Sequence, residues 1–251
     1  ILSSIFSTIH EGGHAIYEQQ IDDIVSETVL GEGTSMGIHE SQSRIFENMF
    51  GRNIDFLKNI FNKFDELFDV RSKGIEVEDF YKIVNTVSKS LIRIEADELT
   101  YPIHIMIRYE LEKEIFSNLE EIESSEYIDY LANKWADMYE EFLGVRPTTN
   151  SEGILQDVHW SSGLFGYFPS YALGSAYAAQ IYNSMNKEFS IEENLSNGNF
   201  DNINSFLKDK IHKFGKSKTP NELLILATGE AFNPDYYINY LKEKYRKIYG
   251  I

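Results

Sequence analysis

The sequence predicts a mainly α-helical fold. Apolar residues recur at helical spacing through most of the 251 residues, capping residues stand at several helix starts, and one short stretch alternates like a strand. The length and a hydrophobic content of 42% suffice for a large buried core. No repeat, low-complexity tract or clear linker divides residues 1–251.

The helices follow from periodicity and caps, in chain order. The first runs to about residue 23, with Ile5, Ile9 and Ile16 at helical spacing and serines before them as caps. A loop at residues 31–34 precedes a second helix over about residues 36–50. The same reasoning predicts helices over about residues 54–68, 79–88, 100–118, 125–143, 173–189, 203–214, 220–228 and 234–249.

Two segments depart from this periodicity. Residues 91–94 alternate apolar and charged side chains, which predicts a short strand. Residues 146–171 contain glycines, prolines and aromatics without a clear period, and the segment is longer than an ordinary connection. Long loops of this kind often carry function.

Composition narrows the class of protein. The formal charge of −17 would repel a polyphosphate, and no Lys/Arg-rich run offsets it, so we expect no nucleic-acid partner. The absence of cysteine leaves His and carboxylate as the ligands for any zinc. The same absence of cysteine makes the cytoplasm the expected location. No apolar run approaches the roughly 18 to 20 residues that span a bilayer, so we expect no membrane segment.

Residues 10–14 read His-Glu-Gly-Gly-His. His10 and His14 are four positions apart, so on a helix they project from one face and can bind one ion. Glu11 stands beside the first ligand, where its carboxylate can take a proton from a zinc-bound water. Because zinc lowers the pKa of that water towards about 7, the pattern predicts hydrolysis of peptide bonds.

A catalytic zinc needs a third protein ligand. Glu40 is the best candidate, because the loop at residues 31–34 returns the chain and a helix begins just before it. Glu27 and Glu32 are closer in sequence but lack that helical presentation. His39, next to Glu40, is a further alternative.

A His-Glu-x-x-His pattern can also arise by chance in a solvated helix. Gly12 and Gly13 argue against chance, because each glycine inside a helix costs about 1 kcal/mol relative to alanine. We expect that a substrate or a packed neighbour approaches the backbone closely there. A helix kink is the alternative explanation.

Four separated motifs point to one family. They are HEGGHAIYEQ at residues 10–19, GIHESQSR at 37–44, IRIEAD at 92–97 and GILQDVHW at 153–160. In sequence and in order they resemble the zinc helix, the HESQ segment and the IRxxAD and GxxQDxHW motifs of the carboxypeptidase Taq, or M32, metallocarboxypeptidases. The resemblance covers about residues 1–180.

The resemblance implies a multi-helix metallopeptidase fold with a long substrate cleft, the zinc helix at its floor and a short β-sheet near residues 91–94. It implies a carboxypeptidase that removes single C-terminal residues of peptides with broad specificity, and a homodimer. It makes Glu40 the third ligand with His10 and His14, and Glu11 the general base. Zinc is the expected metal, with cobalt or manganese as alternatives.

The chain departs from the family pattern at its start. Family members are much longer, and their HPF and DxRxT motifs precede the zinc helix, whereas neither motif precedes His10 here. We therefore expect residues 1–251 to be the zinc-binding catalytic portion of a larger helical peptidase, its C-terminal half. Its partner would be a second copy or an N-terminal half.

Arg93 is the candidate for binding the free carboxylate of a substrate, because its guanidinium can make two parallel hydrogen bonds. Arg108 and Arg146 compete for this role. The alternative is that Arg93 pairs with Glu95 or Asp97.

The segment at residues 146–171 supplies the remaining candidates. His159 and Tyr171 could donate hydrogen bonds to a developing oxyanion, and we assign both to the catalytic set. Tyr167 and Gln156 are assigned to substrate binding. The alternatives are that Gln156 only braces the loop and that the aromatic residues form packed core.

Two other functions compete with the carboxypeptidase. An oligopeptidase of the neurolysin type shares a helical zinc site, and the size of the released products distinguishes it. A metal-binding fragment that is inactive without its N-terminal half is the second.

Overall fold

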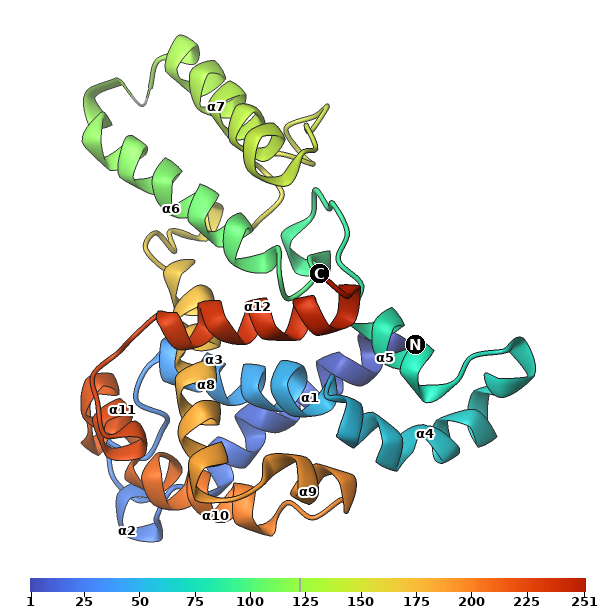
Figure 1. The fold of residues 1–251 in the computed structure, drawn as a ribbon. Coiled ribbons are helices and arrows are strands. Elements are labelled where there is room, and N and C mark those ends of the chain that lie inside the picture. The colour runs from blue at the N-terminus through green and yellow to red at the C-terminus, as the bar shows by residue number, and fades with distance from the viewer. Residues whose placement is uncertain (122) are drawn as a thin grey trace. The chain divides into compact units, whose positions relative to one another are not determined.

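The chain is mainly helical, as predicted. The computed structural model describes residues 1–121 and 123–251. Its α-helices, labelled in Figure 1, are α1 (Leu2–Gln19), α2 (Asp23–Ser26), α3 (Met36–Arg44), α4 (Ile54–Phe68), α5 (Val77–Val84), α6 (Tyr101–Ser117), α7 (Ser125–Leu143), α8 (Pro169–Glu188), α9 (Ile191–Ser196), α10 (Asp201–Lys210), α11 (Pro220–Thr228) and α12 (Asp235–Tyr249).

Helices with clear end signals match the predicted ranges: α4, α7 and α11 begin and end at the expected residues. The first helix is shorter than predicted, because the side chain of Asp22 accepts a hydrogen bond from the backbone N–H of Ile24 and starts α2 there. The predicted helix over residues 36–50 is divided into α3 and a π-helical turn, η1 (Ile45–Gly51). Single π-helical turns are frequent at functional sites.

The predicted strand at residues 91–94 is wrong, and so is the short β-sheet, because the described residues contain no strand. Arg93–Glu95 form a 3-10 turn instead. The side-chain amide of Gln156 takes the place of a partner strand: its Nε2 donates to the carbonyl of Leu91 at 3.0 Å, and its Oε1 accepts from the N–H of Arg93 at 2.9 Å.

The predicted loop at residues 146–171 is irregular for most of its length. It contains a 3-10 turn over Trp160–Ser162, and α8 begins at Pro169, earlier than expected. Proline favours the first turn of a helix, since its fixed φ suits the helix and its missing N–H has no helical partner there.

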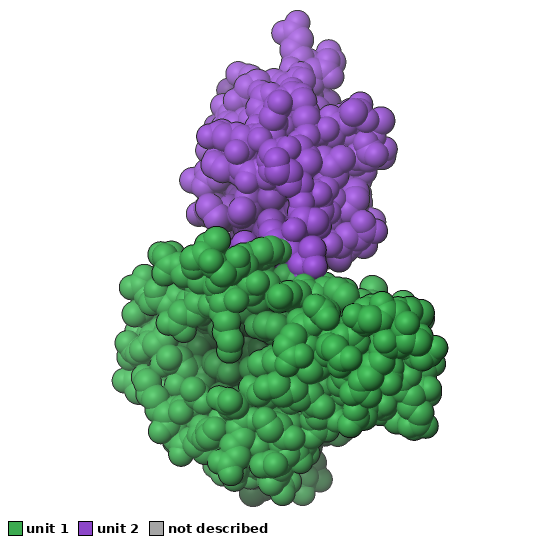
Figure 2. Space-filling model, turned by 45° about the vertical axis from the view of Figure 1, so that its right-hand side comes forward, with its two compact units in different colours: residues 1–85, 173–251 green, residues 86–172 purple. Residues whose placement is uncertain are grey.

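The chain divides into two compact units (Figure 2). The first unit comprises residues 1–85 and 173–251, and the second comprises residues 86–172. Across the described parts of both units, no helix combines the length and the apolar character needed to cross a bilayer.

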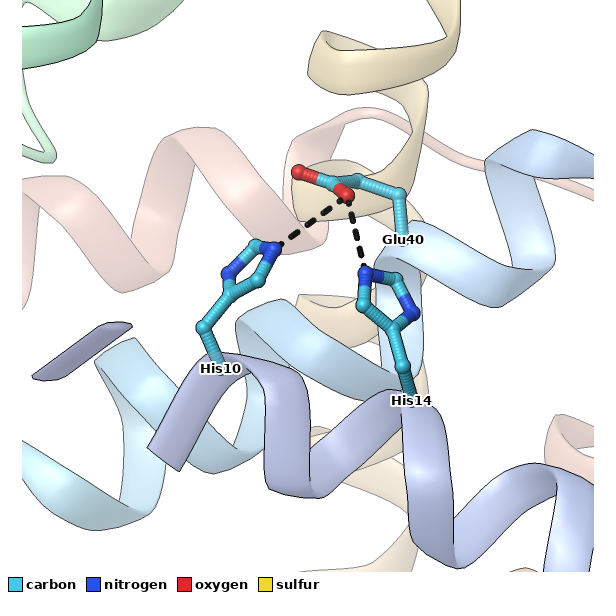
Figure 3. Close-up of side chains that lie close together, drawn as sticks. All are labelled: His10, His14 and Glu40. Atoms are coloured by element: carbon cyan, nitrogen blue, oxygen red, sulfur yellow. Dashed lines mark ion pairs between the residues drawn. The ribbon is translucent and has the colours of Figure 1, made fainter. Parts of the chain in front are cut away.

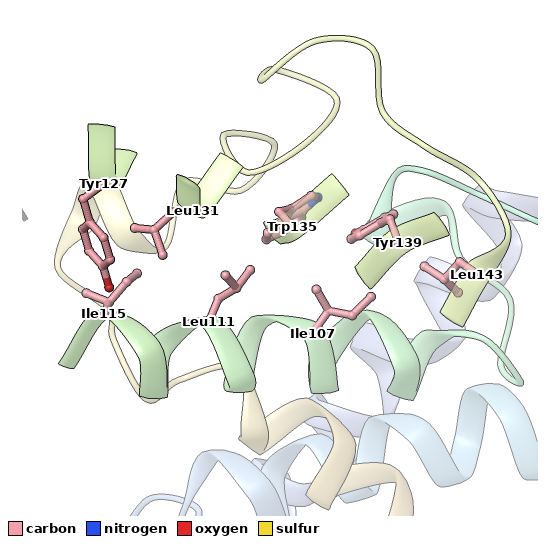
Figure 4. Close-up of a cluster of buried hydrophobic side chains, with 8 residues drawn as sticks. All are labelled: Ile107, Leu111, Ile115, Tyr127, Leu131, Trp135, Tyr139 and Leu143. Carbon is pink, nitrogen blue, oxygen red and sulfur yellow. The ribbon is translucent and has the colours of Figure 1, made fainter. Parts of the chain in front are cut away.

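The core of the second unit lies between α6 and α7. Figure 4 shows apolar side chains, spaced four residues apart on each helix, that interlock between the two. This spacing places them on one face of each helix, so pairing the two faces removes both from water. The buried residues are Ile107, Leu111, Ile115, Tyr127, Leu131, Trp135, Tyr139 and Leu143.

In the first unit, α1 packs against α3 and η1, while α4 packs against α5 and α9. One apolar cluster joins α1, α4 and α5, with Phe6, Leu57, Phe61, Phe80 and Val84 among its buried members. The α1–α3 contact matters most for function, because the HEGGH sequence lies on α1 and the HESQ segment on α3.

Candidate metal centre

Two helices bring the three predicted ligands together. His10 and His14 project from α1 towards Glu40 of α3 (Figure 3), and the Nε2 atom of each histidine lies 3.7 Å from Oε2 of Glu40. One ligand atom from each residue lies within 4.8 Å of the other two. Zinc bonds of about 2.0–2.2 Å in tetrahedral geometry place ligand atoms roughly 3.3–3.6 Å apart, so this donor set fits a zinc ion.

Local structure directs Glu40 inward. The side chain of Ser35 caps α3 by accepting a hydrogen bond from the N–H of Ile38. Arg44, one turn after Glu40, donates from Nε to Oε1 of Glu40 at 2.7 Å, and the other carboxylate oxygen faces the histidines. Gly174 of α8 makes room, because a Cβ there would lie 2.6 Å from Cγ of Glu40.

The two adjacent glycines of the HEGGH sequence differ in their surroundings. A Cβ on Gly13 would lie 2.7 Å from the carbonyl oxygen of Gln42 and 2.7 Å from Cα of Ser43, both on α3. The expected close neighbour of Gly13 is therefore a packed helix, and α1 is continuous through this point rather than broken. A Cβ on Gly12 would meet no described atom within 4 Å.

His10 is oriented by a partly buried carboxylate, that of Glu47. Its Nδ1 lies 2.9 Å from Oε2 of Glu47 on η1, which leaves Nε2 for the metal side. Burial raises the pKa of Glu47, but the hydrogen bond to His10 and the charges of Arg44 and Arg52 outweigh it and lower the pKa to about 2. Glu47 is therefore an ionised acceptor at neutral pH.

His14 has a different neighbour. Its Nδ1 lies 2.6 Å from Nδ1 of His39. Burial, His39 and His10 lower the pKa of His14 to about 4 despite the opposing charge of Glu11. The imidazole is thus neutral at neutral pH, which is the form that binds a metal.

The other candidate third ligands lie in different surroundings. His39 directs Nδ1 towards His14 and Nε2 towards Oε1 of Glu18 at 2.7 Å. Glu27 is exposed, and Glu32 is exposed and paired with Lys216. The group of residues able to hold an ion contains Glu40 and none of these three. Glu11 is exposed on α1, where its carboxylate is free to accept a proton from water.

Arg93 belongs to a buried network of the second unit. Its Nε and Nη2 donate to Oδ1 of Asp157 at 2.9 and 2.7 Å, and Nη1 donates to the hydroxyl of Tyr101 at 2.8 Å. Arg108 donates to the other oxygen of Asp157 at 2.6 Å and to Oε1 of Gln156 at 2.9 Å. Gln156 therefore braces the loop, in addition to any contact with substrate.

The alternative partners of Arg93 do not pair with it. The carboxylate of Asp97 accepts hydrogen bonds from the N–H groups of Ser88, Leu99 and Thr100 and so supports the start of α6. Arg146, the exposed competitor, pairs with Asp137 and Glu140.

His159, Tyr167 and Tyr171 lie together in the second unit. Nε2 of His159 is 3.1 Å from the hydroxyl of Tyr171, and the ring centroid of Tyr167 is 5.5 Å from that of His159. The His159 ring also packs, tilted, against the ring of the buried Phe168, with 4.4 Å between the ring centroids. Burial and the charge of Arg93 lower the pKa of His159. Phe168 is therefore part of the core, whereas His159, Tyr167 and Tyr171 are half-buried.

Sequence reasoning missed several residues of this site. Arg44 and Glu47 follow Glu40 by four and seven positions, which places all three on one helical face, so helical spacing could have found them. Glu18 follows His14 by four positions in the same way. Gly174 carried no local signal, because its role exists only where α8 packs against α3.

Comparison with known proteins identifies the family. A family model of the carboxypeptidase Taq (M32) metallopeptidases matches residues 1–245. The chain belongs to the M32 family. Among M32 proteins, Carboxypeptidase 1 of Bacillus subtilis is 49% identical over 248 residues, and Thermostable carboxypeptidase 1 of Pyrococcus furiosus is 42% identical over 243 residues. A solved M32 carboxypeptidase from Deinococcus radiodurans superposes with a TM-score of 0.91 at 38% identity.

The chain spans about half the length of the M32 relatives it matches. The match covers 98% of this chain but 48% of the Bacillus protein, and 98% of this chain but 49% of the Deinococcus structure. This coverage is consistent with the prediction that the residues correspond to one half of such a protein. The M32 family is a family of metallopeptidases, and His10, His14 and Glu40 form a possible metal site in this member.

Proposed function

We propose that the protein is a zinc-dependent carboxypeptidase that hydrolyses the C-terminal peptide bond of peptides with broad specificity. The observation that carries this proposal is the convergence of His10, His14 and Glu40, each presenting one ligand atom to a common point. The names of the M32 relatives support the reaction class. Two imidazoles and one carboxylate are a typical ligand set of a catalytic zinc.

The reaction needs an activated water and a base. When bound, zinc lowers the pKa of a coordinated water and polarises the substrate carbonyl. The Glu11 carboxylate accepts the proton of the attacking water and then passes it to the departing amine nitrogen. Its exposed position on α1, next to His10, keeps the side chain accessible to water.

His159 and Tyr171 are proposed to donate hydrogen bonds to the negative charge that develops on the carbonyl oxygen. In their 3.1 Å contact one of the two groups donates to the other, so this contact must open before both can donate to the carbonyl oxygen. Tyr167, beside the same ring, is proposed to contact substrate together with Gln156.

Arg93 is proposed to bind the substrate carboxylate. Three of the five N–H bonds of the buried Arg93 guanidinium serve Asp157 and Tyr101, which leaves two that are not committed to these partners. Two arginines share the single negative charge of Asp157, so the network carries a surplus positive charge that suits a carboxylate.

A pair of variants tests the assignment of the metal centre. Glu11→Gln should retain zinc but lose nearly all turnover, because the amide keeps the shape and cannot accept a proton. His14→Ala should lose both. Metal content and release of amino acids from a blocked dipeptide are measured, with the Bacillus subtilis relative as a positive control. Loss of zinc from Glu11→Gln would contradict the division between ligand and base.

The same assay separates the competing functions. Free amino acids released one at a time support the carboxypeptidase, whereas internal cleavage products support the oligopeptidase. Zinc binding without turnover supports the alternative that residues 1–251 are a metal-binding portion that needs a further segment. The predicted homodimer and the cytoplasmic location stay predictions, and light scattering measures the first.

A further inference from the structure

The two ligand histidines contact different groups through their Nδ1 atoms. His10 faces the carboxylate of Glu47 directly, at 2.9 Å. His14 faces a second imidazole, that of His39, at 2.6 Å, and His39 in turn faces Oε1 of Glu18 at 2.7 Å. The second arrangement is therefore a chain of three side chains that ends in a carboxylate.

The hydrogen positions along this chain follow from the metal geometry. If His14 uses Nε2 as its ligand atom, its proton resides on Nδ1 and is donated to Nδ1 of His39. His39 must then accept at Nδ1 and carry its own proton on Nε2, which it donates to Glu18. Every nitrogen in the chain has one role, and no proton is left without an acceptor.

We propose that His39 and Glu18 are positioning residues that hold His14 in the tautomer and orientation required for binding the metal. The inference rests on the proposed metal site and adds two residues to it. It gives His39 of the HESQ segment a role that requires no direct contact with the ion.

The residues around His39 and Glu18 fix the positions of these two side chains. The backbone N–H of Gly33 donates to the same Glu18 oxygen at 3.0 Å, so that oxygen has two donors that fix its position. A Cβ on Gly33 would lie 2.7 Å from Cδ2 of His39, so the loop closes against the ring only with glycine at this position. The ring of Tyr17, fully buried, lies 5.1 Å from that of His39 on another side.

The alternative is that His39 only fills space beside His14. A substitution that keeps the size but removes the polar atoms distinguishes the two explanations. Leucine fills a similar volume without an acceptor. Asparagine is smaller, but its side-chain oxygen can occupy about the position of Nδ1, so it can still accept the proton of His14.

The experiment measures zinc affinity by competition with a chelator, for the 251-residue chain and its variants. His39→Leu should weaken zinc binding about 10- to 100-fold, the usual effect of removing such a support, and His39→Asn should retain most of the affinity. Glu18→Ala should weaken binding about 10-fold. Glu27→Ala, which removes an exposed carboxylate outside the chain of contacts, serves as the matched control and should bind like the parent.

Two further measurements test whether the residues act in series. The double variant of His39→Leu and Glu18→Ala should bind zinc no more weakly than His39→Leu alone, because Glu18 acts through His39. Long-range proton–nitrogen NMR of the zinc-loaded chain should find the proton of His14 on Nδ1 and that of His39 on Nε2. Additive losses in the double variant, or equal affinities of the leucine and asparagine variants, would overturn the proposal.

Failure of the metal site gives a different result. If the parent chain binds no zinc, or if His14→Ala binds as tightly as the parent, the proposed function itself fails. If the parent binds zinc, His14→Ala does not, and every variant of His39 and Glu18 matches the parent, the positioning role is wrong and the metal site stands.

Discussion

The adjacent glycines of the HEGGH sequence allow one physical effect to be isolated. In Gly12→Ala the new Cβ meets no described atom within 4 Å, whereas in Gly13→Ala it lies 2.7 Å from two backbone atoms of α3. Both substitutions gain about 1 kcal/mol of helix propensity in α1. Only Gly13→Ala overpacks the contact between α1 and α3, which costs about 1–3 kcal/mol, because backbone atoms of Gln42 and Ser43 cannot move aside as a side chain can.

The difference in unfolding free energy between the two variants is therefore about 1–3 kcal/mol, because the propensity gain is common to both. For a chain of this size each kcal/mol corresponds to about 2–4 °C in Tm. Thermal unfolding without metal, followed by circular dichroism, measures this difference. Gly12→Ala should melt above the parent, and Gly13→Ala, with a net change of about 0 to −2 kcal/mol, at or below it. Equal shifts for both variants would refute the reasoning, since they would mean that α1 and α3 are not in close backbone contact at residue 13.

Two other predictions concern acid stability and the second unit. Burial lowers the pKa of His104 and of His212 to about 3. Below about pH 6.5 the unfolded chain therefore binds protons at these residues while the folded chain does not, and the urea midpoint of unfolding should fall between about pH 7 and about pH 5. A constant midpoint over this range would contradict the prediction. Glu112→Gln should cost about 1–3 kcal/mol and red-shift tryptophan fluorescence, because Trp160 and the N–H of Gly166 donate to different oxygens of Glu112 and the amide replaces one of them with an NH2 group. Glu110→Gln, on an exposed part of α6, is its control and should do neither.

The error at residues 91–94 shows where periodicity alone misleads. Alternation of apolar and charged side chains reports which way side chains point, but a strand also needs a partner for its backbone groups. Here that partner is the side chain of Gln156, which lies far along the chain. One amide satisfies two backbone groups of the segment, and Arg93–Glu95 then turn instead of extending.

More of the metal centre than of the loop at residues 146–171 could be predicted from the sequence. His10 and His14 share one helix, so their common direction follows from 3.6 residues per turn. Glu40 required the family motif as well, because spacing left Glu27, Glu32 and His39 as alternatives. The roles proposed for His159, Tyr167 and Tyr171 had less support, since aromatic residues in an irregular segment serve either packing or chemistry.

By itself, the sequence determined the helical class, the ends of α4, α7 and α11, the pair of histidines on one helix face and the family resemblance. These properties depend on local geometry or on contiguous motifs. The tertiary structure decided which oxygen of Glu40 faces the histidines, which carboxylate supports each histidine, and why Gly13 and Gly174 must lack side chains. Such properties depend on atoms from separate helices meeting within a few ångströms, and no periodicity along the chain encodes that distance.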